Sequence, residues 1–250
     1  MKTVLITGCS SGYGLETARH FLAQGWNVVA TMRTPQAAAL PASDRLRVLA
    51  LDVTRPESIE HALAQAGAID VLVNNAGIGL FGSFEATPMA TVREVFETNT
   101  FGTMAVCQAI IPRFRERGAG SIVNVTSSAT LAPFPLVAAY TASKSAVEGF
   151  TASLAHELKA FDVRVKLVEP GYGPSTQFTA NGQQRMQGLI PPSYEAFAHS
   201  VFAGFADLAA VTQASDVAEA IWQAANDSSE RLHYAAGADA VALSLRRRIA

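Results

Sequence analysis

The stretch Lys2–Gly14, KTVLITGCSSGYG, determines how the rest of the chain is organised. Its run Val4–Ile6 is apolar and has no helical periodicity, which predicts a strand buried on both faces of a parallel sheet. Gly8, Gly12 and Gly14 follow in a TGxxxGxG arrangement, and the next segment, LETARHFLAQ, has the apolar spacing of an amphipathic helix. The stretch therefore predicts a strand, a glycine turn and a helix.

A turn of this kind is suited to holding an anion. The N-terminus of a helix offers unpaired N–H groups and about half a positive charge, and glycines let a pyrophosphate approach the backbone. A glycine turn can also serve only to pack a helix onto a strand, but the strand before it and the helix after it favour dinucleotide binding. The residues assigned to this site are Gly8, Ser10, Ser11, Gly12, Tyr13 and Gly14.

Length and composition indicate a single domain comprising residues 1–250. A chain of this length, with 49% hydrophobic residues, buries a large core without disulfides or metal. The formal net charge of −2 argues against nucleic acid as a partner. Cys9 and Cys107 are too few for a disulfide framework, which fits a reducing compartment. No apolar run is long enough to span a bilayer, and we expect a cytoplasmic protein with a small-molecule partner.

Apolar runs alternate with helical periodicities, which predicts an α/β fold: a Rossmann-type doubly wound parallel sheet of about seven strands with helices on both faces. After the first strand, further strands are predicted at Gly25–Thr31, Arg47–Leu51, Ile69–Val73, Ser121–Thr126, Val163–Val168 and His233–Ala236. Helices are predicted at Pro56–Ala66, Thr91–Arg117 (one or two helices), Ala138–Phe161 and, after a Ser215–Asp216 cap, Val217–Asn226. Ala37–Leu40 is expected to form a loop or a short helix, and Arg246–Arg248 a solvated tail.

The end of the second predicted strand indicates which dinucleotide binds. An acidic side chain at this place accepts hydrogen bonds from the adenosine ribose, whereas a basic one neutralises a 2′-phosphate. Met32 and Arg33 stand here without a carboxylate, which favours NADP(H); alternatively, Arg33 simply lies in solvent.

Asp52 follows the third predicted strand. It could accept a hydrogen bond from the adenine amino group, with Val53 near the ring, or it could cap the next helix with Thr54.

Three motifs stand in order along the chain: TGCSSGYG at Thr7–Gly14, NNAG at Asn74–Gly77 and YTASK at Tyr140–Lys144. Together they resemble the short-chain dehydrogenase/reductase family, in its group of single-domain chains. The segment ATMR at Ala30–Arg33 looks most like the branch that includes hydroxysteroid and retinol dehydrogenases. The resemblance suggests a homodimer or homotetramer, although the small and apolar residues of the helices concerned are equally explained as core.

The family resemblance also implies roles for individual residues. It assigns cofactor contacts to Asn75, Ala76 and Gly77. Asn99 matches the family position whose backbone carbonyl binds a water molecule in a proton relay. The alternative is that Asn99 has no such role and is a packing or capping compromise, as a buried asparagine in a helix usually is.

Tyr140 and Lys144 are four residues apart in a predicted helix, so they lie on the same helix face. Hydride transfer to a carbonyl needs a proton at the oxygen, and a tyrosine is a candidate donor. We expect a nearby ammonium to lower the pKa of the phenol. Lys144 could also hold the nicotinamide ribose, and Ser127 would donate to the substrate oxygen. Ser127 is preferred to Ser128 because its separation from Tyr140 is the family's usual one; the alternative for the pair is an ordinary amphipathic helix with an exposed lysine.

The turn after the sixth predicted strand departs from the family pattern. Pro170 and Gly171 form the expected turn that shapes the nicotinamide pocket, but the sequence continues as PGYGPST. Gly173 replaces the usual apolar residue, and Pro174 has no N–H, so a backbone contact to the cofactor is expected to be missing or rearranged. A hydroxyl could come from Ser175 or Thr176, which follow.

Residues Gln177–Ala210 are predicted to form a lid over a hydrophobic pocket. The segment is apolar and broken by glycine and proline; its aromatic residues could instead form satellite core or subunit contacts. The apolar and aromatic residues are Phe178, Met186, Leu189, Ile190, Tyr194, Phe197, Phe202 and Phe205.

Two kinds of function follow from these patterns. The first is an NADP(H)-dependent oxidoreductase that interconverts a ketone or aldehyde and an alcohol on a mainly apolar substrate. The alternative is a catalytically silent NADP(H)-binding sensor or regulatory protein, which only the altered PGYGPST turn favours. A Rossmann-like methyltransferase would share the glycine turn but would not require YxxxK.

No metal ligands are assigned, because the histidines show no ligand spacing: His20, His61, His156, His199 and His233.

Overall fold

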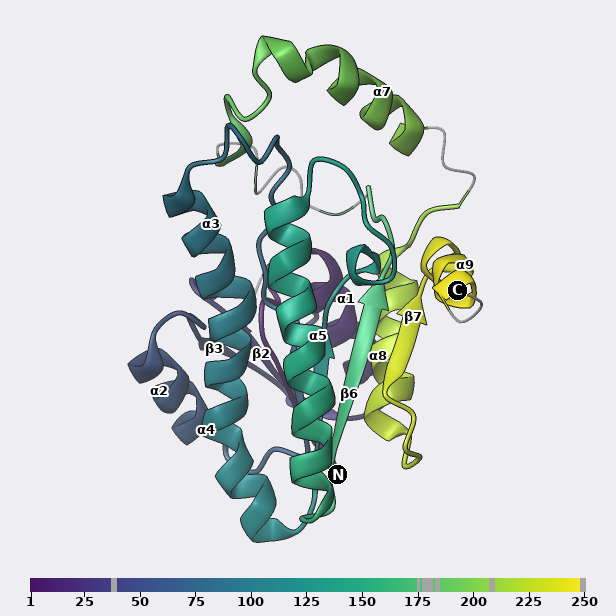
Figure 1. Cartoon of the computed structure of the whole chain (residues 1–250). Coiled ribbons are helices and arrows are strands. Elements are labelled where there is room, and N and C mark those ends of the chain that lie inside the picture. Colours follow the sequence, from purple (N-terminus) through teal and green to yellow (C-terminus); the bar gives the residue numbers. More distant parts are fainter. Residues whose placement is uncertain (37–39, 175, 177–181, 183–184, 207–209, 248–250) are drawn as a thin grey trace.

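The structure is a computed structural model that describes residues 1–36, 40–174, 176, 182, 185–206 and 210–247 (Figure 1). Within these residues, seven parallel strands form one sheet with the order β3-β2-β1-β4-β5-β6-β7. The strands are β1 (Thr3–Ile6), β2 (Asn27–Met32), β3 (Leu46–Ala50), β4 (Val71–Asn74), β5 (Gly120–Val125), β6 (Val163–Pro170) and β7 (His233–Ala236). The predicted doubly wound parallel sheet is confirmed, and each predicted strand overlaps an observed one.

The strand order reverses next to β1. The chain proceeds from β1 through β2 to β3 at one edge, then returns to β4 on the other side of β1 and continues to β7. Ligands of such sheets bind outside the carboxyl ends of the strands at this switch point. The glycine turn follows β1 directly and therefore lies at that place.

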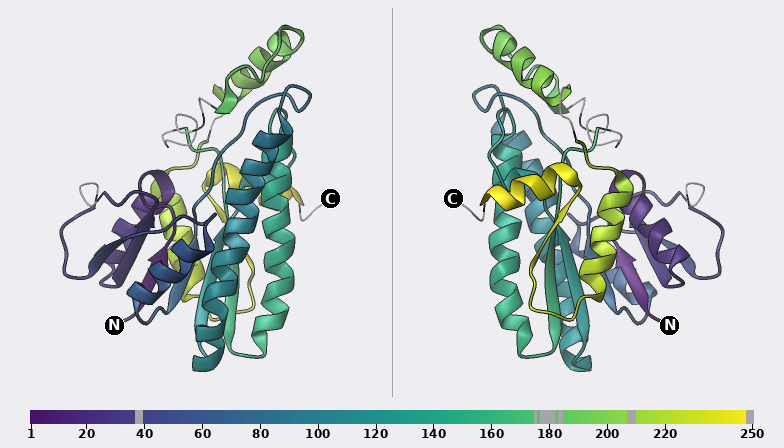
Figure 2. Two further views of the ribbon diagram at one scale, coloured as in Figure 1. Left: turned by 90° about the vertical axis from the view of Figure 1, so that its left-hand side faces the viewer. Right: turned by 90° about the vertical axis from the view of Figure 1, so that its right-hand side faces the viewer.

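Helices cover both faces of the sheet (Figure 2). One face carries α1 (Gly12–Ala23) and α8 (Ala214–Asn226), and the other carries α2 (Pro56–Ala66), α4 (Gly102–Arg117) and α5 (Ala138–Lys159). The first strand shows why both faces need cover, because Val4 and Ile6 enter one core and Leu5 enters the other, all fully buried. Side chains of a strand alternate between the two faces.

The helix predicted over Thr91–Arg117 consists of three consecutive parts. Helix α3 (Met89–Phe96) continues through a π-helical turn (Glu97–Phe101) into α4. A π-helical turn is a local widening of an α-helix and is frequent at functional sites. Asn99 lies inside this turn and is fully buried.

Two predicted details of the helices differ in the structure. Helix α8 begins at Ala214, and its capping box pairs Gln213 with Asp216, so the predicted Ser215–Asp216 cap is only partly right. Arg246 belongs to helix α9 (Ala238–Arg247) rather than to a tail, because apolar residues of that stretch recur at helical spacing. Residues 37–39 and Arg248 lie outside the described residues.

Asp52 does not cap α2, whose N-cap is Arg55 without a side-chain hydrogen bond. Instead, Asp52 Oδ1 accepts hydrogen bonds from the backbone N and the Oγ1 of Thr54, at 3.0 and 2.8 Å. The carboxylate therefore stabilises the turn between β3 and α2, as an aspartate does in an Asx turn.

Above the carboxyl edge of the sheet, helix α7 (Glu195–Ala206) projects away from the main body (Figure 1). Short 3₁₀ turns stand at Ser128–Thr130, after β5, and at Pro192–Tyr194, before α7. Across the described parts of the chain, every helix is too short or too polar to cross a membrane.

Candidate active site

The glycine turn packs too closely against neighbouring atoms for a side chain at Gly8 or Gly14. Gly8 and Gly12 have φ angles of +75° and +56°, in the left-handed region that glycine adopts most easily. A Cβ on Gly8 would come within 2.8 Å of Ala76 Cα, and a Cβ on Gly14 would overlap the Gly8 carbonyl. Ser11 is the N-cap of α1 and makes no side-chain capping bond. The first N–H groups of α1 thus suit a bound phosphate, so the turn fits a dinucleotide.

Asn75 fastens the end of β4 to this turn. Its Nδ2 donates to the carbonyl oxygens of Thr7 and Gly8 at 3.0 and 3.2 Å. Thr7 Oγ1 in turn accepts from the backbone N of Asn75 and of Ala76, both at 3.0 Å. These bonds tie the end of β4 to the end of β1, and the NNAG segment therefore borders the glycine turn.

Asn99 holds the next residues of this segment with both ends of its side chain. Its Oδ1 accepts from Ile78 N at 2.8 Å, and its Nδ2 donates to Ile78 O at 3.0 Å and to Ser143 Oγ at 3.1 Å. The backbone carbonyl of Asn99 accepts from Thr103 Oγ1 at 2.9 Å. A carbonyl oxygen has two lone pairs, so a second donor can still bind there. The side chain thus links β4, the π-helical turn and α5.

Ser127, Tyr140 and Lys144 come together where β5 ends and α5 begins. The Ser127 hydroxyl is hydrogen-bonded to the Tyr140 phenol. Lys144 Nζ donates to the carbonyl oxygen of Val125 at 3.0 Å. A Cβ on Gly77 would lie 3.4 Å from Lys144 Nζ and 3.2 Å from Asn99 Oδ1, so a larger side chain there would press on these two groups.

Burial controls the ionisation of both groups. Desolvation raises the pKa of Tyr140 to about 12, and the hydrogen bond from Ser127 opposes that shift only in part. Desolvation also lowers the pKa of Lys144 to about 8. The expected lowering of the Tyr140 pKa is therefore wrong for this state of the protein, because removing the phenolate from water outweighs the favourable contacts.

The two serines at the end of β5 have different surroundings. Ser127 is partly exposed, is the N-cap of the 3₁₀ turn, and accepts from Ala129 N at 3.2 Å. Ser128 is buried. The hydrogen bond to Tyr140 belongs to Ser127, in agreement with the preference for Ser127.

The predicted adenosine-binding residues lie at the ends of β2 and β3. Arg33 directly follows β2 and is exposed. Val53 is buried against Gly102, where a Cβ would come within 2.7 Å of Val53 Cγ2. Arg33 also lowers the pKa of Glu94 in α3, although more weakly than Arg185 does.

The altered turn after β6 has a structural explanation. A Cβ on Gly173 would overlap the Tyr13 hydroxyl, so glycine replaces the usual apolar residue to make room for the Tyr13 ring. Burial raises the pKa of Tyr13, and the negative charges that Tyr140 and Asp239 can carry raise it further. The glycine turn after β1 and the turn after β6 therefore meet at Tyr13 and Gly173.

Sequence reasoning missed Asp239, which holds this turn in place. Asp239 Oδ2 accepts from Tyr172 N at 2.7 Å, and Oδ1 accepts from Thr212 Oγ1 at 2.6 Å. A Cβ on Gly171 would overlap the same carboxylate. One feature of the sequence could have indicated Asp239, because it is an acidic residue at the start of a helix that follows the carboxyl end of a strand.

The described part of the predicted lid is attached to the segment between β4 and α4. Arg185 Nη2 lies 2.6 Å from Glu94 Oε1, and Tyr194 OH donates to Glu85 Oε2 at 2.9 Å. Leu189 is buried beside Tyr140 in an apolar cluster. Phe178 and its neighbours 177–181 lie outside the described residues.

Four aromatic rings gather beside the predicted catalytic residues. The Phe205 centroid lies 5.1 Å from that of Tyr172, 6.0 Å from Phe134 and 6.2 Å from Phe81. Tyr172 belongs to the turn after β6, and Phe134 lies between Ser127 and Tyr140 in the chain. These contacts fit the predicted lid and equally the alternative of a satellite core.

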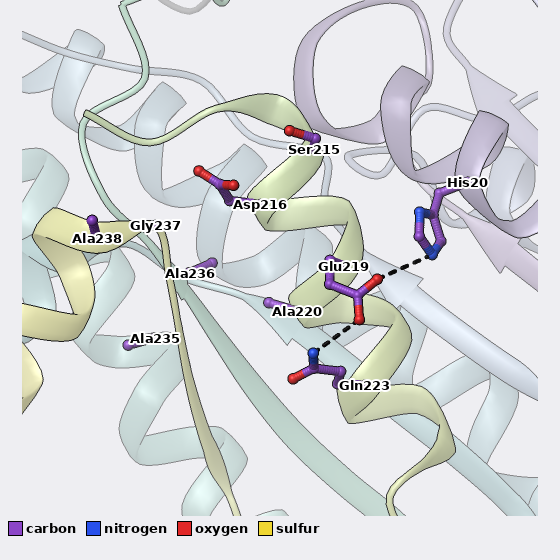
Figure 3. Close-up of a pocket in the computed structure, with 10 residues that line it drawn as sticks. All are labelled: His20, Ser215, Asp216, Glu219, Ala220, Gln223, Ala235, Ala236, Gly237 and Ala238. Carbon is purple, nitrogen blue, oxygen red and sulfur yellow. Dashed lines mark hydrogen bonds and ion pairs between the residues drawn. The ribbon is translucent and has the colours of Figure 1, made fainter. Parts of the chain in front are cut away.

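A separate groove of about 640 Å³ lies between α8 and the connection from β7 to α9 (Figure 3). His20 Nε2 lies 3.5 Å from Glu219 Oε2, and Gln223 donates to the other Glu219 oxygen at 2.9 Å. None of the residues that line it belongs to the predicted site, so no cofactor role is assigned to this groove.

The sequence matches the family model for short chain dehydrogenases over residues 2–187. The chain belongs to the short-chain dehydrogenase/reductase family, which is a family of oxidoreductases. It is 41% identical over 181 residues to the uncharacterized oxidoreductase YusZ of Bacillus subtilis, with 68% of this chain and 64% of that protein covered. It is 44% identical over 182 residues to retinol dehydrogenase 8 of Bos taurus, with 68% and 58% covered. The chain spans about three fifths of the length of these curated relatives.

Solved structures agree with this family. A short-chain dehydrogenase from Streptomyces avermitilis has a TM-score of 0.83 and 34% identity, with 99% of this chain and 92% of that chain covered. ElxO with NADP bound has a TM-score of 0.78 and 26% identity, with 94% and 97% covered. The 3-ketoacyl-(acyl-carrier-protein) reductase from Brucella melitensis, complexed with NADH, has a TM-score of 0.76 and 27% identity, with 94% and 96% covered. Similar structures thus hold either dinucleotide.

Proposed function

We propose that this chain is an NADP(H)-dependent oxidoreductase that interconverts a ketone or aldehyde and an alcohol on a mainly apolar substrate. The observation that carries the proposal is the hydrogen bond between Ser127 and Tyr140, where Tyr140 shares helix α5 with Lys144. Family membership supports oxidoreductase chemistry, and the fit of the glycine turn to a pyrophosphate supports dinucleotide binding.

The proposed reaction divides into hydride and proton transfer. When bound, the nicotinamide supplies or accepts the hydride and, in its oxidised form, contributes a positive charge. Tyr140 donates its phenolic proton to the carbonyl oxygen during reduction and accepts a proton during oxidation. Ser127 donates a hydrogen bond to the same oxygen and so stabilises the negative charge that develops there. A pKa of about 12 keeps Tyr140 protonated at neutral pH, which suits its role as the acid in reduction.

The other residues position this pair. Lys144 is proposed to bind the nicotinamide ribose hydroxyls through its ammonium group, and Asn99 holds Ile78 and Ser143 in place around it. Asp239 fixes the backbone of Tyr172 beneath the nicotinamide pocket. The remaining proposed cofactor contacts are Gly8, Ser10, Ser11, Gly12, Tyr13, Gly14, Arg33, Asp52, Val53, Asn75, Ala76, Gly77, Pro170, Gly171 and Gly173.

The test of the proposed chemistry is the substitution Tyr140→Phe. Loss of the phenolic proton removes the acid, so turnover of a panel of apolar ketones with NADPH is expected to fall by about 10²–10⁴-fold. Cofactor affinity, followed by NADPH fluorescence, is expected to change little. Comparable turnover in wild type and variant would contradict the role of Tyr140. Tight NADPH binding by a wild type that turns over no substrate would favour the alternative of a sensor.

The preference for NADP(H) is tested with Arg33→Ala. Arg33 is exposed at the end of β2, where a guanidinium can pair with a 2′-phosphate. The variant is expected to bind NADPH about tenfold more weakly, an effect of about 1.4 kcal/mol, and to bind NADH as the wild type does. NADH binding at least as tight as NADPH binding, with no effect of the substitution, would overturn the preference.

A further inference from the structure

Three side chains gather at the sheet edge away from the glycine turn. They are Glu148 from α5, Glu169 from β6 and His233 from β7, and their potential ligand atoms all lie within 4.8 Å of one another. We propose that Glu148, Glu169 and His233 bind a divalent transition-metal ion, for which Zn²⁺ is the probe. The inference does not depend on the proposed reaction, because it rests on other side chains.

The sheet itself brings two of these residues together. Strand β6 pairs with β7 so that Leu167 lies opposite His233 and Glu169 lies opposite Ala235. Side chains alternate along a strand, so Glu169 and His233 point to the same face of the sheet. Val163 and Val165 of β6 pack in the same core as Leu154 of α5, which identifies that face as the one covered by α5. Glu148 approaches from this helix.

Glu169 is the residue that indicates a missing ligand. Its side chain is only 1% exposed, and its Oε1 lies 3.0 Å from His233 Nδ1. Among the residues that the structure describes, its buried Oε2 has no hydrogen-bond partner. Withdrawing a carboxylate oxygen from water without a partner is unfavourable, and buried polar atoms in proteins are nearly always paired. A cation between the two glutamates and His233 would supply that partner.

The donor set selects the kind of ion. One imidazole nitrogen and two carboxylate oxygens suit Zn²⁺ and its neighbours in the first transition series, whereas Ca²⁺ and Mg²⁺ prefer oxygen alone. Bonds of about 2.0–2.2 Å place adjacent ligand atoms roughly 3 Å apart, which agrees with the contact between Glu169 and His233. Glu148 must move closer to join them. The His233 side chain is 42% exposed, so water can reach the ion and complete its coordination.

A bound ion would lie directly beside the turn after β6. Glu169 immediately precedes Pro170 and Gly171, and the backbone N of the next residue, Tyr172, donates to Asp239. An ion that binds only the folded chain raises its stability in proportion to the logarithm of the ion concentration. Stabilisation of the folded chain is therefore a readout that needs no substrate or cofactor.

The experiment titrates metal-stripped wild-type protein with Zn²⁺ by calorimetry and follows the melting temperature in parallel. We expect one equivalent of Zn²⁺ to bind and to raise the melting temperature. His233→Ala is expected to weaken binding at least about tenfold, since even a residue that only orients a ligand contributes that much. His61→Ala, which removes an exposed histidine from α2, is the matched control and should bind as the wild type does.

Glu148→Gln is a second variant, chosen because it leaves the buried Glu169 unchanged. It is also expected to weaken Zn²⁺ binding. The proposal is overturned if the wild type shows no saturable Zn²⁺ binding. It is equally overturned if His61→Ala weakens binding as much as His233→Ala, or if both site variants bind Zn²⁺ as the wild type does. None of these outcomes affects the proposed reductase activity, which is measured separately.

Discussion

At the scale of single residues, Lys144 illustrates how a functional group opposes stability. The side chain is 5% exposed, and its Nζ donates one hydrogen bond, to Val125 O. Burial lowers its pKa from 10.5 to about 8, which corresponds to a penalty on the ammonium of roughly 3 kcal/mol. A charged amine is therefore kept at a place where an apolar side chain would be more stable, as expected of a site that binds a ligand.

Lys144→Met tests this trade-off. We expect the free energy of unfolding at pH 7 to rise by about 1–2 kcal/mol and turnover to fall by orders of magnitude. In the wild type, the destabilisation that comes from burying the charged amine is fully present below about pH 8. It is lost as pH rises toward 10.5, because the neutral amine then predominates in both the folded and the unfolded protein. The difference between variant and wild type, measured by urea unfolding, should shrink over that range. A difference that does not change with pH would refute the assigned cause.

At the same scale, the sequence predicts which residues belong to the site better than it predicts their surroundings. Ser127, Tyr140 and Lys144 could be assigned to one site because the chain spacing and the family pattern agree. The direction of the Tyr140 pKa shift could not be predicted, since it depends on how deeply the fold buries the phenol. Asp239 was missed for a related reason, because its partner Tyr172 lies far away in the chain.

At the scale of elements, the strands were predicted well because each is a short apolar run bounded by a turn. The limits of the long helices were predicted less well. The sequence pattern did not separate the π-helical turn Glu97–Phe101 from α3 and α4. The metal ligands proposed above come from α5, β6 and β7, so no local spacing could have indicated them. Contacts between distant elements are what a single sequence conceals.

The attachment of the lid to α3 gives a prediction at this scale. Glu94→Gln removes the negative charge that pairs with Arg185, whose Nε and Nη2 both donate to Glu94 Oε1 in charge-assisted hydrogen bonds. We expect KM for an apolar substrate to rise severalfold with little change in melting temperature, since exposed ion pairs contribute at most about 1 kcal/mol. Glu97→Gln, which neutralises a carboxylate three residues further on, is the control. Equal KM values for both variants would argue against a role of the contact in positioning the lid.

At the scale of the whole molecule, stability depends on strands buried from both sides. Leu5 is fully buried between α-helical layers in the interior of the sheet. Leu5→Ala is expected to lower the free energy of unfolding by about 3 kcal/mol, whereas Leu245→Ala, at a position that is 55% exposed, should change it by less than about 0.5 kcal/mol. Chemical denaturation measures both. Similar losses for the two variants would contradict the two-core description.

The position of β1 inside the sheet also has a consequence for biosynthesis. Strand β1 leaves the ribosome well before β4, which is one of its two hydrogen-bonding neighbours, with Val4 opposite Val71. At typical translation speeds, roughly 3 to 14 seconds separate the appearance of these two strands. During that interval the nascent chain carries an apolar segment with one unpaired side, which is the kind of surface that chaperones recognise.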